Sequence, residues 1–77
     1  MQRYFLNIID SHGRLNDPEG SHHPDIAAAR AEAIASAREL MCHAITAEGR
    51  IGLHRVVEIT DEHGHVLLEV PFREAAA

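Results

Sequence analysis

The chain has 77 residues, enough for one small domain, and we expect residues 1–77 to form it as a single unit. Twelve acidic residues against seven arginines and no lysine give a formal net charge of −5, which argues against nucleic-acid binding because that normally requires a basic excess. One cysteine cannot form an internal disulfide, and no apolar run approaches the roughly 18 residues of a membrane-spanning helix. With no signal-peptide pattern in its opening residues, the chain is expected to be a soluble cytoplasmic protein without a membrane partner.

The first predicted element is a strand over residues 3–9, RYFLNII, which is rich in aromatic and β-branched side chains. Both of its faces are largely apolar, so we expect it to lie inside a sheet rather than at its edge. Alternation places Tyr4, Leu6 and Ile8 on one face and Phe5, Asn7 and Ile9 on the other. A second strand is predicted over residues 14–20, RLNDPEG, at an edge and ending early, because Pro18 has no backbone N–H to donate.

The clearest predicted element is a helix over residues 25–46, in which alanine dominates and Asp25 is the expected N-cap. Gly49 is the expected residue after its C-terminus. The small side chains in the middle of the helix would let its axis approach a sheet closely. At about 100° per residue the apolar side chains form one stripe. It consists of Ile26, Ala33, Ala37, Leu40, Met41 and Ala44, with Ile34 and Ile45 at its margin.

Two further strands are predicted over residues 54–60 and 65–72, in which apolar and polar residues alternate. The final residues, 73–77, are expected to fray. The order of elements is therefore strand, strand, helix, strand, strand. We predict an α+β fold with one four-stranded, mainly antiparallel sheet and a single helix packed on one face. A right-handed crossover through the helix favours the spatial order second, first, third, fourth.

The sequence D-x-H-G occurs twice, at residues 10–13 and 61–64. Aspartate at the first position and glycine at the fourth is typical of a type I turn, with glycine taking a positive φ. Because each copy lies between two predicted strands, both are interpreted as hairpin turns. Turn chemistry alone accounts for the repeat.

The chain also resembles a family of short bacterial proteins known only as a domain of unknown function. The resemblance is carried by RYF at residues 3–5, DPEG at 17–20, the alanine-rich AAARAEA at 27–33, EITDEHG at 58–64 and VPF at 70–72. It covers nearly the whole chain and implies a bacterial intracellular protein with the fold predicted above. It implies no activity.

Seven histidines raise the alternative of a divalent-metal site. The predicted topology brings the loop before the helix and the last hairpin turn to one end of the sheet. Imidazole and carboxylate ligands together suit Zn or Ni. The candidate ligands are His22, His23, His63 and His65, but they lack a recognised ligand spacing, and no cofactor is expected.

The sequence shows no pattern typical of an enzyme. Its serines lack a motif that positions a base, and it has no glycine-rich phosphate loop. Cys42 and His43 are adjacent on the predicted helix, so their side chains point about 100° apart. The arginines are dispersed among glutamates, which is typical of surface ion pairs rather than of a nucleic-acid interface.

An interaction module is the function that the sequence favours. One helix can cover only one face of the predicted sheet, which leaves large side chains on the other face. We expect that face to be buried by another protein or by a second copy of the chain. The side chains predicted to form it are Phe5, Ile9, Val56 and Leu67.

Overall fold

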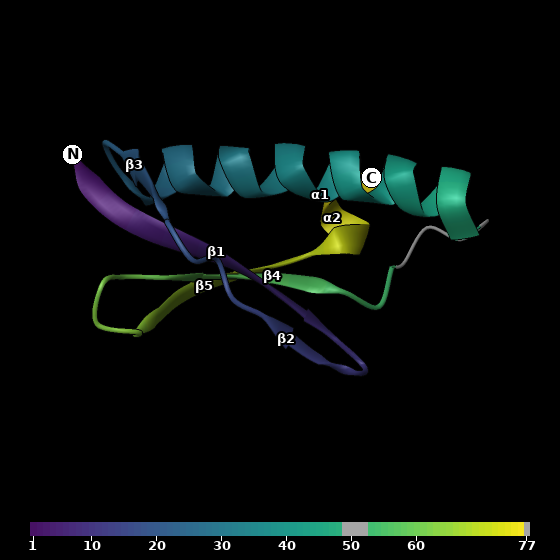
Figure 1. Ribbon diagram of the computed structural model, residues 1–77. Coiled ribbons are helices and arrows are strands. Elements are labelled where there is room, and N and C mark those ends of the chain that lie inside the picture. Colours follow the sequence, from purple (N-terminus) through teal and green to yellow (C-terminus); the bar gives the residue numbers. More distant parts are fainter. Residues whose placement is uncertain (49–52, 77) are drawn as a thin grey trace.

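The computed structural model describes residues 1–48 and 53–76, with the side chains of residues 1–43 and 53–76. These residues form one five-stranded antiparallel sheet with two helices on the same side of it (Figure 1). No helix among them combines the length and the apolar character needed to cross a membrane. The strands are β1 (Gln2–Asp10), β2 (Gly13–Leu15), β3 (Ser21–His23), β4 (Val56–Thr60) and β5 (Val66–Pro71), and the helices are α1 (Ile26–Glu48) and α2 (Phe72–Ala76).

The strand order β2-β1-β4-β5 is the predicted one, and the α+β class is confirmed. The long first strand is central, as its two apolar faces indicated, and β4 and β5 form the C-terminal hairpin. The prediction of four strands was wrong by one. The predicted second strand ends at Leu15, and Ser21–His23 form β3 on the same β1 strand. Because β1 is nine residues long and β2 pairs only with its last three, its first residues remain open for a second partner.

Residues 16–20 close the edge of β1 between these two short strands. The backbone N–H of Leu6 donates to Asp17 Oδ2 at 3.2 Å, and the N–H of Asp17 donates to Asn7 Oδ1 at 2.9 Å. Asp17 Oδ1 also accepts from the N–H groups of Glu19 and Gly20. The Asp17 carboxylate therefore satisfies the edge N–H of Leu6, which a continuous strand would otherwise pair, and also holds its own bend. Pro18 lies outside any ladder.

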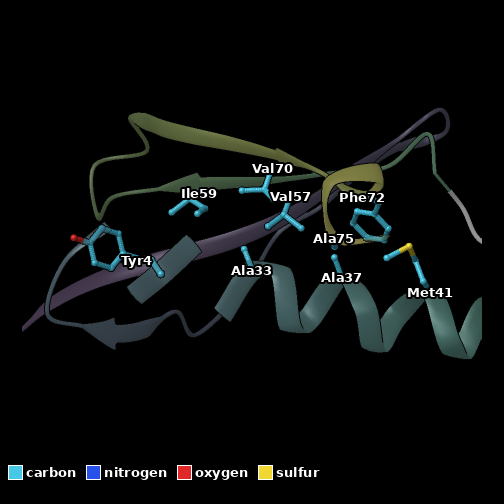
Figure 2. Packing of buried hydrophobic residues seen from close by; sticks show 10 residues of the cluster. Tyr4, Ala33, Ala37, Met41, Val57, Ile59, Val70, Phe72 and Ala75 are labelled. Carbon is cyan, nitrogen blue, oxygen red and sulfur yellow. The ribbon is translucent and has the colours of Figure 1, made fainter. Parts of the chain in front are cut away.

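Helix α1 begins as predicted, because Asp25 Oδ1 accepts the N–H of Ala28 at 2.9 Å and caps its first turn. The predicted stripe is confirmed at Ala33, Ala37 and Met41, which are buried against the sheet (Figure 2). Ile26 and Leu40 are instead 38% and 37% exposed, and Ala29 is buried in their place. The helix lies so close to the sheet that its central line accepts small side chains, while larger ones spread to its flanks. The predictions at Ala44, Ile45 and Gly49 concern side chains and residues outside the described part.

The C-terminal residues form a helix in place of the frayed end and the single-helix fold that the sequence predicted. Phe72 begins α2, is fully buried, and lies between the sheet and Met41 (Figure 2). Its N–H donates to the Arg55 carbonyl at 3.0 Å. Ala75 is 2% exposed, and its carbonyl accepts Arg38 Nε at 2.8 Å. Long-range contacts with α1 hold this short helix, and no local pattern predicts them.

Both D-x-H-G segments form the predicted turns. The N–H of Gly64 donates to the Asp61 carbonyl at 3.2 Å, and Gly64 has a φ of 83°. In the first copy the N–H of His12 donates to Asp10 Oδ1 at 2.8 Å, and Gly13 has a φ of 145°. In each segment, therefore, the aspartate accepts hydrogen bonds within the turn and the glycine adopts the positive φ that the turn requires.

Candidate functional site

One face of the sheet, here called the open face, carries neither of the helices formed by the described residues (Figure 1). Tyr4 is buried on the helix side, so alternation along β1 directs the odd-numbered residues to the open face. Directly paired residues share a face, so the strand register assigns the rest. Three rows run across the open face. They are Phe5, Thr60 and Val66; then Asn7, Glu58 and Glu69; then Arg14, Ile9, Val56 and Pro71.

The structure brings Phe5, Ile9 and Val56 of the predicted interaction surface onto this face, where all three are partly exposed. Leu67 has a different environment. A register shift between Ile59 and Thr60 makes Leu67 the extra residue of a β-bulge. Val66, 51% exposed, takes its place opposite Thr60, and Leu67 is 45% exposed at the bulge. No sequence signal marks this bulge.

Phe5 is partly covered at its end of the open face. The Arg3 guanidinium carbon lies 5.2 Å from the centre of the Phe5 ring, and Arg3 Nε donates to the Glu19 carbonyl at 2.8 Å. Gly20 packs beside the ring, with a φ of 72°. The segment that closes the β1 edge therefore also shields one aromatic side chain. The apolar surface that stays accessible lies nearer to Val66, Ile9 and Val56.

The middle row of the open face is acidic. Glu58 and Glu69 lie directly opposite one another on β4 and β5. Arg14 reaches across β1 to Glu58, with 2.5 Å between Nη2 and Oε1. Glu69 is exposed and forms no ion pair with any residue in the described ranges 1–48 and 53–76. Like charges placed directly opposite across strands are destabilising, so this pair favours a further cation near Glu69.

The two edges of the sheet are poor sites for adding a strand. The β1 edge is occupied by β2, β3 and Asp17. The β5 edge carries the bulge at Leu67, the charge of Glu69, and Pro71, which has no N–H to donate. Each of these features is a known means of discouraging edge-to-edge pairing. The open face, rather than an edge, is therefore the surface available for a partner.

The candidate metal ligands lie at one end of the sheet, as the topology predicted, but they do not converge. His22 and His23 pair with Arg3 and Gln2, so their side chains lie on opposite faces. His23 Nε2 is hydrogen bonded to Ser21 Oγ at 3.0 Å, and its ring packs beside Tyr4. Within residues 1–48 and 53–76, no three His, Cys, Asp or Glu side chains form a group that could hold a metal ion.

The other two histidines belong to the β4–β5 turn. The rings of His63 and His65 lie 6.1 Å apart, and His65 Nδ1 lies 3.2 Å from Asp61 Oδ2. Met1, Gln2 and Arg3 face this turn across a shallow hollow of about 310 Å³. The hollow therefore separates this turn from the start of β1, and His22 and His23 lie on the neighbouring strand β3. The Asp61 carboxylate, however, is already engaged by its own turn.

Both turn aspartates are held in the ionised form. Donation from the backbone N–H of His12 lowers the pKa of Asp10 below its ordinary value. Burial alone would raise the pKa of Asp61, but the N–H groups of His65 and His63 outweigh it and lower that pKa. Turn hydrogen bonds are therefore the cause of the lowered pKa of both carboxylates.

A second hollow, of about 320 Å³, lies between α1 and the β1–β2 hairpin. Its apolar wall includes Ile8, Leu15 and Leu40. At its rim Arg55 Nε lies 4.0 Å from Asp10 Oδ2, so these two charges largely neutralise one another. His12 and Arg14 also line the hollow, on the side of the β1–β2 hairpin.

A comparison with protein families places a match over residues 3–73, to the family described as "Domain of unknown function (DUF6894)". The match covers most of the 77 residues and agrees with the resemblance seen in the sequence motifs. No curated protein and no solved structure matches the chain. The description of the family names no ligand, partner or reaction.

Proposed function

Because the chain belongs to this family of unknown function, we propose its role from its own surface: a non-catalytic interaction module of the bacterial cytoplasm that self-associates or binds another protein. The observation that carries the proposal is the open face. Both helices lie on the other side of the sheet, and the open face presents Ile9, Val56 and Val66 to a partner. Phe5 and Leu67 lie at its margins.

The small interior supports the same proposal. Among the residues whose side chains the structure describes, four of the ten buried hydrophobic ones are alanines, and the four largest fully buried side chains are Phe72, Ile59, Val57 and Val70. A domain of this size buries a smaller share of its surface than a larger one does. Covering a half-exposed valine or leucine contributes roughly 1 kcal/mol, from about 25 cal/mol per Å² of apolar surface removed from water. A second chain on the open face would therefore add appreciably to a small core.

The experiment is sedimentation equilibrium over a wide range of protein concentration. Wild-type protein is expected to associate, and Val66→Asp is expected to raise the dissociation constant at least tenfold, because it puts a charge on the open face. Leu15→Asp is the matched control. Leu15 is also exposed on a short edge strand, at 71%, but its partner Ile8 faces the helices. A wild-type monomer at every concentration, or equal effects of both variants, would contradict self-association through this face.

Divalent-metal binding is the alternative proposal, through His22, His23, His63 and His65. It is supported by the placement of β3 and the β4–β5 turn at the same end of the sheet. Calorimetric titration with Zn²⁺ tests it. The proposal expects one saturable site that is lost in the double variant His63→Ala, His65→Ala and kept in His43→Ala, a control on the exposed side of α1. Weak, non-saturating binding shared by all three proteins would rule it out.

A further inference from the structure

We infer that the partner on the open face is a second copy of this chain, related by a two-fold axis that runs parallel to the strands. This inference rests on the proposed function, since it specifies how the self-associating chains are oriented. The axis pairs β5 of one chain with β2 of the other, and β4 with β1. It is selected by the distribution of charge on the open face.

That charge is divided across the strands. Arg14 lies on β2 at one side of the face, and its side chain is 45% exposed even while it contacts Glu58. Glu69 lies on β5 at the other side and forms no ion pair among the described residues. Three strand spacings, about 14 Å in total, separate β2 from β5. Among the described residues of one chain, therefore, Arg14 reaches Glu58, and no cation pairs with Glu69.

Two symmetric ways of packing the face on itself differ in what meets Glu69. An axis parallel to the strands reverses the strand order, so that Glu69 lies over β2 of the partner, within reach of its Arg14. A two-fold axis perpendicular to the strands, placed at the middle row, keeps each strand over the same strand of the partner. The middle row of one chain then lies over the middle row of the other. Glu69 would face Glu69, and the acidic row would repel itself. The axis parallel to the strands therefore places Arg14 of each chain near Glu69 of the other, so that both carboxylates are neutralised.

The apolar positions agree with the same axis. Ile9 on β1 and Val56 on β4 are direct neighbours in the third row, and the axis places each over the other in the partner. Asn7, which is 4% exposed, and Glu58 exchange places in the same way, so that two Glu58 carboxylates are not brought together. Aligned sheets pack about 10 Å apart, a distance that these side chains span.

Other occupants fit this surface less well. A partner strand has no free edge to join, because one edge is closed by Asp17 and the other carries a bulge and Pro71. A single-sign partner would leave either Arg14 or Glu69 uncompensated, whereas a second copy supplies both signs in the required places. Four strands at about 4.8 Å spacing give a footprint at the small end of specific interfaces, so the expected dimer is weak, with a micromolar dissociation constant.

The test is a charge-swap cycle measured by sedimentation equilibrium. Arg14→Glu and Glu69→Arg are each expected to weaken association at least tenfold, because each places like charges together. The double variant is expected to return to within about threefold of wild type, since the swapped charges meet again between chains. Circular dichroism and thermal unfolding of each variant verify the fold. If Arg14→Glu fails to fold beside Glu58, the cycle is repeated with Arg14→Gln and Glu69→Gln, which should lose the same coupling and the salt dependence of association.

The outcomes separate the two proposals. If Val66→Asp abolishes association while the charge swap gives no rescue, the open face is the interface but the two-fold arrangement is wrong. If wild-type protein stays monomeric, self-association itself fails. Rescue of association in the double variant without a matching gain in thermal stability supports the arrangement specifically, because a coupling within one chain would also raise the stability of that chain.

Discussion

At the scale of single residues, we expect the fold to depend most on positions where the backbone conformation and a close neighbour both restrict the side chain. Asp17 follows β2 and accepts the N–H of Leu6 at the β1 edge, although the sequence presents it only as part of a D-P-E-G bend. Gly20 is the last residue of that bend and lies against β1. A methyl group at Gly20 would come within 2.9 Å of the Tyr4 carbonyl oxygen and of a Phe5 ring carbon. The sequence predicts a turn here but not this close approach.

Gly20→Ala is therefore expected to destabilise the protein by about 2–4 kcal/mol, from positive φ together with the backbone clash. Gly64→Ala is the matched control. Gly64 has a similar φ of 83°, but no atom lies within 4 Å of the added methyl group. We expect that variant to lose only about 1 kcal/mol. Urea unfolding followed by circular dichroism measures both, and equal losses would mean that the packing at Gly20 is unimportant.

At the scale of elements, the difference between α1 and α2 shows which helices a sequence can predict. Helix α1 has an N-cap and a long alanine-rich stretch, so its existence follows from local preference. Helix α2 has only five residues, too few for stability in isolation. It forms because Phe72 inserts between the sheet and α1, and because Arg38 and Arg30 bond to Ala75 and Glu74.

Phe72→Ala is expected to cost about 3–5 kcal/mol, because it leaves a cavity under α1. That loss is a large part of the roughly 4–12 kcal/mol available to a chain of this size. Arg73→Ala, at the neighbouring exposed position, should change stability by less than about 0.5 kcal/mol. Thermal unfolding compares the two variants with wild type. Similar stability of all three would mean that the C-terminal helix does not contribute to the core.

At the scale of the whole molecule, both helices of the described residues lie on one side of the sheet, and the other face is covered only in part, around Asn7 and Thr60. The sequence already indicated this, because the first strand is apolar on both sides and only one long helix is present. The charges of that face, which orient the proposed dimer, could not be predicted. Arg14 is far from Glu58 and Glu69 along the chain, and a shift of one residue in register would move all three to other neighbours.

The main strands and helix, both D-x-H-G turns and the cap at Asp25 could be predicted from the sequence alone, because alternation, capping and turn preferences act within a few residues of each other. The strand order followed from these elements and from the usual handedness of a crossover through a helix. Only the tertiary structure decided the third strand, the bulge that exchanges Val66 for Leu67, the C-terminal helix and the charged rows of the open face. These depend on which distant segments pack together, because their free energy comes from contacts that no local preference encodes.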